Sequence, residues 1–182
     1  MSKTKDERIA EFKEFMAPVG KPTEIDKLIE RLKEIEFFTA PASTKYHGAY
    51  EGGLFDHSIA VARQLILLTE ALELKWDRPE SPYIVGMFHD LCKCDNYVFD
   101  IETGKYKYNP IVIIPGHGDK SVILLQRLFH LTLEEIACIR WHMGAYETNT
   151  KMWEYYGTAI EEYPNVLFTH TADMIASKII GV

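Results

Sequence analysis

The sequence predicts an all-α protein with one small β-hairpin near residues 96–109, and three observations lead to this prediction. Apolar residues recur three and four positions apart through most of the chain, which is the spacing of one helix face. Glycines, prolines and capping residues separate these periodic segments. One stretch instead has two short runs rich in aromatic residues around a Glu102-Thr103-Gly104-Lys105 turn, which is typical of a hairpin.

The N-terminal half predicts three helices, at about 5–16, 23–37 and 54–74. Thr23 is placed to cap the second helix, because a threonine side chain can accept a hydrogen bond from the backbone of the first turn. The loop at 39–53 is marked by Pro41, Gly48, Gly52 and Gly53. Apolar residues cover much of the circumference of the third helix, so we expect it to be central and buried.

The remainder of the chain predicts four further helices, at about 81–92, 118–130, 133–142 and 164–180. Thr132 and Glu135 have the spacing of a capping box at the start of the 133–142 helix. Several aromatic residues lie between Trp141 and Tyr156, and Tyr146 is one of them. We expect these rings to pack in the core rather than to stack on a nucleobase.

The composition indicates one globular domain. The chain has 182 residues, of which 47% are hydrophobic and 26% are charged, and this length suits a single core. We expect residues 1–182 to form one domain with a helical N-terminal extension over about 1–37. No apolar run reaches the length of a bilayer span, and the charged N-terminus lacks the apolar stretch of a signal peptide. We therefore expect no membrane partner and a cytoplasmic location.

Charge and cysteine content narrow the partners further. The net charge is −7 and no cluster of lysine and arginine stands out, so long nucleic acid is not expected as a partner. A small phosphorylated ligand stays possible, and the oligomeric state stays open. Cys92, Cys94 and Cys138 cannot all pair with one another, and we expect them to be reduced and structural.

Six residues have side chains that bind metals and lie on or near the ends of predicted helices. They are His57, His89, Asp90, His117, His142 and Asp173. A single histidine is more often a hydrogen-bonded core residue than a ligand, but a helical bundle can bring such positions together around metal ions. Imidazole and carboxylate ligands suit Fe, Mn, Co, Ni or Zn. Because a carboxylate has two oxygens, Asp90 could bridge two cations.

The order and context of these residues closely resemble those of the HD-domain metal-dependent phosphohydrolases, from about residue 38 to the last helix. The resemblance is carried by Gly52-Gly53-Leu54-Phe55-Asp56-His57-Ser58, Phe88-His89-Asp90-Leu91-Cys92-Lys93 and Thr171-Ala172-Asp173. It implies an HD-type helical bundle in which His57, His89, Asp90 and Asp173 are metal ligands. It also implies that His117 and His142 match two histidines that hold a second metal in some members, which favours two metals over one.

The same resemblance assigns further residues. Lys93 matches a lysine that faces the substrate phosphate, although Cys92 stands where glycine is common, which puts the local loop shape in question. The segment from Ala40 to Leu54 is similar to the one before the first ligand in HD domains of bacterial three-prime-to-five-prime exoribonucleases. By that analogy His47 approaches the substrate. Those enzymes also have an OB-fold that grips RNA, for which this chain has no room, so the RNA substrate is not carried over.

The resemblance therefore implies a phosphomonoesterase or phosphodiesterase that acts on a nucleotide or another small phosphate ester through a metal-bound hydroxide. In this hypothesis Asp90 and Lys93 are catalytic, Lys93, His47 and His117 bind substrate, and Asp119 accepts a proton or organises water. Two alternatives stay open. One is a di-iron, O₂-dependent oxygenase of the myo-inositol oxygenase type, and the other is an HD domain that senses a nucleotide without turnover.

Overall fold

The computed structural model describes residues 3–144 and 150–182, which form eight α-helices and one two-stranded hairpin. The helices are α1 (Lys5–Phe15), α2 (Pro22–Glu34), α3 (Gly53–Ala71), α4 (Ser81–Phe88), α5 (Gly118–Leu125), α6 (Leu133–Trp141), α7 (Thr150–Glu162) and α8 (Asn165–Met174). The strands are β1 (Tyr97–Asp100) and β2 (Lys105–Tyr108), and two short helices complete the list: a 3-10 helix at Leu91–Cys94 and a π-helix at Ile175–Ile180. The prediction of an all-α bundle with a small β excursion is thus confirmed.

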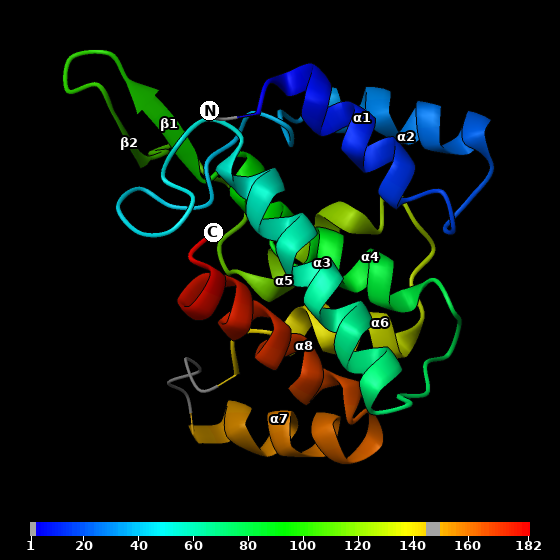
Figure 1. Ribbon diagram of the computed structural model, residues 1–182. Helices are drawn as coiled ribbons and strands as arrows, with labels where there is room; N and C mark the ends of the chain where they lie inside the picture. Colours follow the sequence, from blue (N-terminus) through cyan, green and yellow to red (C-terminus); the bar gives the residue numbers. More distant parts are fainter. Residues whose placement is uncertain (1–2, 145–149) are drawn as a thin grey trace.

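Helix α3 is the central element, and it contacts α4, α8 and the π-helix (Figure 1). Its buried residues cover most of its first half, as the sequence predicts. The approach of α4 depends on Gly86, because a Cβ atom at this position would lie 2.4 Å from the Cα atom of Ala62 on α3. This close contact holds the end of α4, and with it His89, against the middle of α3.

Helices α1 and α2 lie side by side at one end of the bundle, and α7 lies at the opposite end (Figure 1). The buried Arg8 of α1 forms an ion pair with Asp56 at 3.1 Å, and Asp56 is the residue before His57. Phe12 of α1 makes edge-on contacts with Phe38 and Phe88. The N-terminal helices therefore brace the segment of α3 from which His57 projects.

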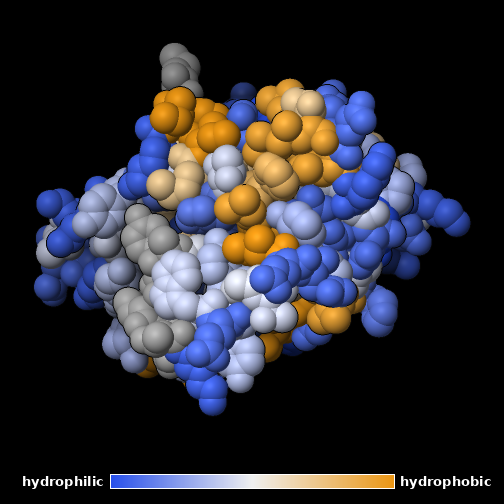
Figure 2. Space-filling view, turned by 90° about the horizontal axis from the view of Figure 1, so that it is seen from below, coloured by the Kyte–Doolittle hydropathy of each residue, from blue (hydrophilic) through white to orange (hydrophobic). Residues whose placement is uncertain are grey.

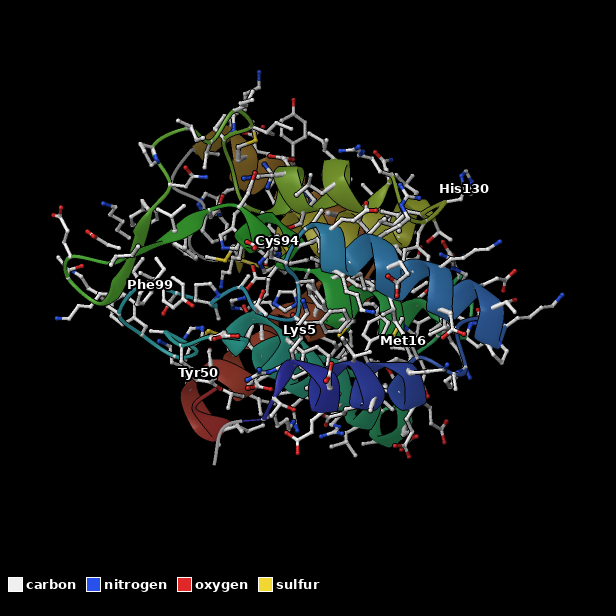
Figure 3. The ribbon with its side chains drawn as sticks, turned by 90° about the horizontal axis from the view of Figure 1, so that it is seen from above. Lys5, Met16, Tyr50, Cys94, Phe99 and His130 are labelled. Atoms are coloured by element: carbon white, nitrogen blue, oxygen red, sulfur yellow. The ribbon has the colours of Figure 1, made fainter. Side chains whose placement is uncertain are left out.

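The hairpin projects from the bundle, with Phe99 on it and His130 at the opposite end of the molecule (Figure 3). The two strands are antiparallel, and Tyr97 pairs with Tyr108. Ile101 beyond β1 is 88% exposed. Few hairpin side chains are thus held by the helical core.

Some local predictions are corrected by the structure. Pro22 opens α2 and Lys21 is its N-cap, so Thr23 lies inside the first turn and does not cap it. The carboxylate of Glu24 accepts the hydrogen bond from the Lys21 backbone N–H instead, at 2.8 Å. The capping box of Thr132 and Glu135 is confirmed.

Two helices that the sequence predicts as continuous change their helix type close to the predicted site residues. The predicted helix at 81–92 ends at Phe88 and continues after Asp90 as the 3-10 helix, and the predicted 164–180 helix changes to a π-helix after Met174. Helix α7 was not predicted. The rings of Trp141 and Tyr156 pack 5.8 Å apart, as expected of core aromatics. The expectation is wrong for Trp153 and Tyr155, which are 41% and 52% exposed on α7, and Tyr146 lies outside the described residues.

The surface carries apolar as well as charged side chains. A band of apolar side chains crosses one part of the face seen from below in Figure 2, beside mainly hydrophilic groups. Leu167 of α8 and Ile179 of the π-helix are among the exposed large apolar residues. Within the part of the chain that the structure describes, no helix is both long enough and apolar enough to cross a membrane.

Candidate metal centre

Five of the predicted site residues line one pocket of about 510 Å³. They are His47, Asp90, Lys93, His117 and Asp173. The other three predicted ligands, His57, His89 and His142, are fully buried directly behind this pocket. We call His57, His89, Asp90 and His142 the floor of the pocket.

Helix ends position most of these side chains. His57 lies in the second turn of α3, whereas His89 and His142 are the C-cap residues of α4 and α6. His117 is the N-cap of α5, and Asp173 lies one residue before the end of α8. The ends of several helices therefore meet at one point, which is how a bundle gathers ligands that are far apart in sequence.

The carboxylate of Asp90 is the centre of the cluster, and its two oxygens face different histidines. Oδ2 lies 3.6 Å from Nε2 of His57 and 3.4 Å from Nε2 of His89. Oδ1 lies 3.2 Å from Nδ1 of His117 and 3.4 Å from Nε2 of His142. Each oxygen of the carboxylate thus faces its own pair of histidines.

Asp173 completes the group on the Oδ2 side. Its Oδ1 lies 3.2 Å from Nε2 of His57, and the Nε2 atoms of His57 and His89 are 3.3 Å apart. Three sets of side chains have potential ligand atoms within 4.8 Å of one another: His57, His89 and Asp90; His89, His142 and Asp173; Asp90, His117 and His142. The buried histidine and aspartate groups can therefore bind metal ions.

Main-chain oxygen atoms fix the orientation of the three floor histidines. The Nδ1 atoms of His57, His89 and His142 lie 2.9, 2.9 and 2.7 Å from the oxygens of Val182, Gly86 and Ile139 respectively. A main-chain oxygen only accepts a hydrogen bond, so each Nδ1 carries a proton and donates it. When the ring is neutral, its Nε2 directs a lone pair into the cluster, which is the state that a metal-binding imidazole needs.

Two buried polar atoms of the cluster lack a hydrogen bond. Among the described residues, neither Oδ1 of Asp90 nor Nε2 of His142 has a hydrogen-bond partner, although both atoms are fully buried. Such atoms carry a desolvation cost that a partner normally offsets. A cation between them would serve both, because each offers a lone pair. The donor set and its unpaired atoms therefore fit a divalent transition metal.

The charges around Asp90 keep it ionised. Burial would raise the pKa of Asp90, but the Lys93 ammonium and the nearby imidazoles hold it well below its usual range. Burial likewise opposes ionisation of Asp173, yet its contact with His57 and the charge of His89 lower its pKa. Burial lowers the pKa of His117 to about 4. Both carboxylates and the neutral His117 are thus in the protonation states that metal binding requires.

Lys93 reaches Asp90 because of the 3-10 helix. Residues three apart eclipse each other in this kind of helix, so the Lys93 Nζ lies over Asp90, 2.6 Å from Oδ2. The side chain is nearly buried but still lines the pocket. Cys92 fits this turn because its φ is negative, a backbone conformation that any residue can adopt. Among the described non-glycine residues, only Glu36 and Glu73 have a positive φ. The glycine that is common at this position in the HD-domain phosphohydrolases is therefore not needed for the shape of this turn.

His47 lies beside the cluster, and Asp119 lies apart from it. The His47 ring is 5.0 Å from the His57 ring, and burial, aided by the charges of His57 and Lys93, lowers its pKa to about 4. Asp119 forms an ion pair with Arg140 and lines a different, neighbouring pocket. The structure therefore brings His47 to the candidate site but does not bring Asp119 there.

Several pocket residues were missed by the sequence analysis. Tyr46, Ser177 and Lys178 line the pocket together with Met143 and Met174. His170 was not missed: it lies three residues before Asp173, on the same helical face, where the sequence predicts a residue that orients a ligand. It also lines the pocket, and its Nδ1 donates to the main-chain oxygen of His142 at 2.7 Å. Ser177 and Lys178 gave no signal, because no pattern in the sequence marks the π-helix that carries them.

One part of the chain is similar to a known enzyme. No family model matches the chain, and no solved structure matches it. The chain is 36% identical over 62 residues to a dihydroneopterin 2',3'-cyclic phosphate phosphodiesterase of Methanocaldococcus jannaschii, a match that covers 32% of this chain and 25% of that protein. The chain thus matches about a quarter of the length of this curated relative. The relative and the cluster together support a metal-dependent phosphohydrolase in general terms.

Proposed function

We propose that residues 1–182 form an HD-type domain that hydrolyses a phosphomonoester or phosphodiester bond in a nucleotide or another small phosphate ester. The observation that carries this proposal is the position of Asp90, whose two oxygens face two different pairs of histidines at 3.2–3.6 Å. A carboxylate in that position is suited to bridge two cations, and pairs of cations are common in enzymes that hydrolyse phosphate esters.

In this proposal two divalent metals, of Fe, Mn, Co, Ni or Zn, are held by the six predicted ligands. His57, His89 and Asp173 lie on the Oδ2 side of Asp90, and His117 and His142 lie on the Oδ1 side. When bound, such cations would supply positive charge that activates water and offsets charge on a phosphate. The imidazoles and the two ionised aspartates would hold this charge in place.

The remaining pocket residues would bind and orient the substrate. The Lys93 ammonium is nearly buried, so its contact with a phosphate oxygen would be little screened by solvent. The charge of Asp90 outweighs the effect of burial and raises the pKa of Lys93, which keeps the ammonium protonated. His47 is neutral at pH 7 and can donate one hydrogen bond to the substrate. Asp119 is paired with Arg140, and we therefore give it no catalytic role.

The relative from Methanocaldococcus jannaschii supports the phosphodiester arm of the proposal. That protein is named for the hydrolysis of dihydroneopterin 2',3'-cyclic phosphate, which is a cyclic phosphodiester. Because the match covers 25% of that protein, the pterin is not transferred to this chain. Only the reaction class, hydrolysis of a phosphodiester, enters the proposal for this chain.

The test combines metal content with a substrate panel. Protein purified without chelators or an affinity metal is analysed for Fe, Mn, Co, Ni and Zn against protein concentration. It is then assayed with 2',3'-cyclic AMP, 3'-AMP, 5'-AMP and bis-p-nitrophenyl phosphate, with and without O₂. We expect about two metals per chain, in line with a two-metal site, and O₂-independent release of a phosphomonoester or phosphate.

Three results would contradict the proposal. Turnover that needs iron and O₂ and releases no phosphate would indicate the oxygenase instead. Tight nucleotide binding by the metal-loaded protein without any product would indicate a sensing domain. A chain that binds no metal even after reconstitution would exclude both the metal centre and the reaction.

A further inference from the structure

The π-helix that follows α8 brings two consecutive side chains to one wall of the pocket. Asp173, Ser177 and Lys178 all line this pocket. In an α-helix with 3.6 residues per turn, a residue four positions after Asp173 shares its face, but the next residue is turned well away. The π-helix at Ile175–Ile180 has wider turns, closed by bonds between residues five apart. Ser177 and Lys178 can therefore both face the pocket.

These residues lie at a different depth from Lys93. Lys93 is 8% exposed and contacts Asp90 at the floor, whereas Lys178 is exposed. One helical turn separates Lys178 from Asp173, which corresponds to a rise of about 5 Å along the axis. The pocket thus has one lysine at its floor and a second lysine near its mouth.

Neither side chain of the π-helix is strongly engaged within the protein. Across residues 3–144 and 150–182, no carboxylate lies within ion-pair distance of Lys178. The Ser177 hydroxyl has a long contact of 3.5 Å to the Met174 carbonyl. A positive charge and a hydroxyl are therefore available to a ligand in the pocket of a chain whose net charge is −7.

We propose that Ser177 and Lys178 form a second anion-binding subsite, so that the substrate is a phosphate ester with a second phosphate beyond the one that is hydrolysed. The scissile phosphate would lie at the floor with Lys93, and the second phosphate would contact Lys178 near the mouth. A pocket of about 510 Å³ has room for such a molecule, since sites for small organic ligands span about 300–1,000 Å³. This inference rests on the proposed function.

The test uses non-hydrolysable ligands, so that binding is measured without turnover. Metal-loaded protein is titrated calorimetrically with propylphosphonate and with propane-1,3-bisphosphonate. We expect the bisphosphonate to bind about tenfold more tightly, beyond the statistical factor of two, because a charge-assisted contact is added. The advantage should shrink as salt is raised, because Lys178 is exposed and its charge is screened.

Matched variants assign the effect to Lys178. We expect Lys178→Ala to lower bisphosphonate affinity about five- to tenfold and to leave propylphosphonate affinity within about twofold. Lys178→Arg should retain the advantage. Lys27→Ala is the control, because Lys27 is an exposed lysine of α2 outside this pocket and its loss changes the net charge equally.

The two proposals fail in different ways. Equal affinity of the wild-type protein for the two ligands, or an equal loss for both in Lys178→Ala, would overturn the second subsite and leave the phosphohydrolase intact. Failure of the metal-loaded protein to bind either ligand would overturn the phosphate site itself, and the second subsite with it.

Discussion

The floor of the pocket and its rim, which we define as Tyr46, Ser177 and Lys178, differ in how the protein holds them. Each floor histidine donates a hydrogen bond to a main-chain oxygen and is fully buried. At the rim, Tyr46 is 81% exposed on a loop and Lys178 is exposed on the π-helix. Side chains locked by packing keep a fixed geometry, so the floor is suited to hold metals. The rim is suited to adapt to the rest of a substrate.

This difference predicts that floor variants change metal binding and turnover, whereas rim variants change the choice of substrate. The largest effect should come from Asp90→Asn. An amide cannot offer two anionic oxygens, so the two groups of histidines would lose their shared ligand. We expect kcat/KM to fall about a thousandfold or more, with loss of bound metal by elemental analysis.

Asp119→Asn is the matched control for this substitution. Asp119 is also an aspartate near the cluster, but it pairs with Arg140 outside the pocket. We expect its kcat/KM to stay within about threefold of the wild-type value. Near-normal turnover in Asp90→Asn would contradict the proposed site, and a large loss in Asp119→Asn would restore the proton-transfer role that the sequence predicts for it.

Metal removal should have the next largest effect, and it tests whether the floor needs its ligand to be stable. A cation present at about a thousand times its Kd stabilises the folded state by about 4 kcal/mol. It would also give partners to the unpaired Asp90 Oδ1 and His142 Nε2 atoms. We expect chelation to lower the Tm by several degrees and added metal to restore it. An unchanged Tm after verified metal loss would mean that the cluster is held by protein contacts alone.

Gly86→Ala should disturb the floor indirectly. The new methyl group would lie 2.4 Å from the Cα atom of Ala62, so α3 and α4 would have to separate. Overpacking of this kind costs about 2–3 kcal/mol, measured as the free energy of unfolding in urea. The shift would also move the Gly86 carbonyl that orients His89, so metal affinity should fall.

Gly157→Ala is the control for this effect, because a Cβ at Gly157 on α7 would meet no atom within 4 Å. Alanine in an open helical position should stabilise the protein by about 0.5–1 kcal/mol. If both variants lower stability equally, the cost at Gly86 is not one of close helix packing.

The floor and the rim also differ in how far the sequence could predict them. His57, His89 and Asp90 lie in short motifs, and their neighbours form helices whose apolar spacing is plain in the sequence. The rim depends on the π-helix at Ile175–Ile180, and hydrophobic spacing does not distinguish one wide turn from a regular helix. Asp119 shows the opposite error, because the sequence assigns it to the site and the structure does not. It lies two residues after His117, but it pairs with Arg140 and lines a different pocket.

Tyr46→Ala should have the smallest effect, and it sharpens the contrast between floor and rim. The loop is held by main-chain contacts that the variant keeps, since the Tyr46 backbone N–H donates to the Ser43 hydroxyl at 2.9 Å. Loss of an exposed ring should change stability by less than about 0.5 kcal/mol. We expect metal content and kcat to be unchanged and KM to rise by no more than about threefold. Tyr108→Ala is the control, because this tyrosine is 73% exposed on the hairpin, and it should change neither constant. A tenfold loss of kcat in Tyr46→Ala alone would mean that the rim takes part in the chemical step.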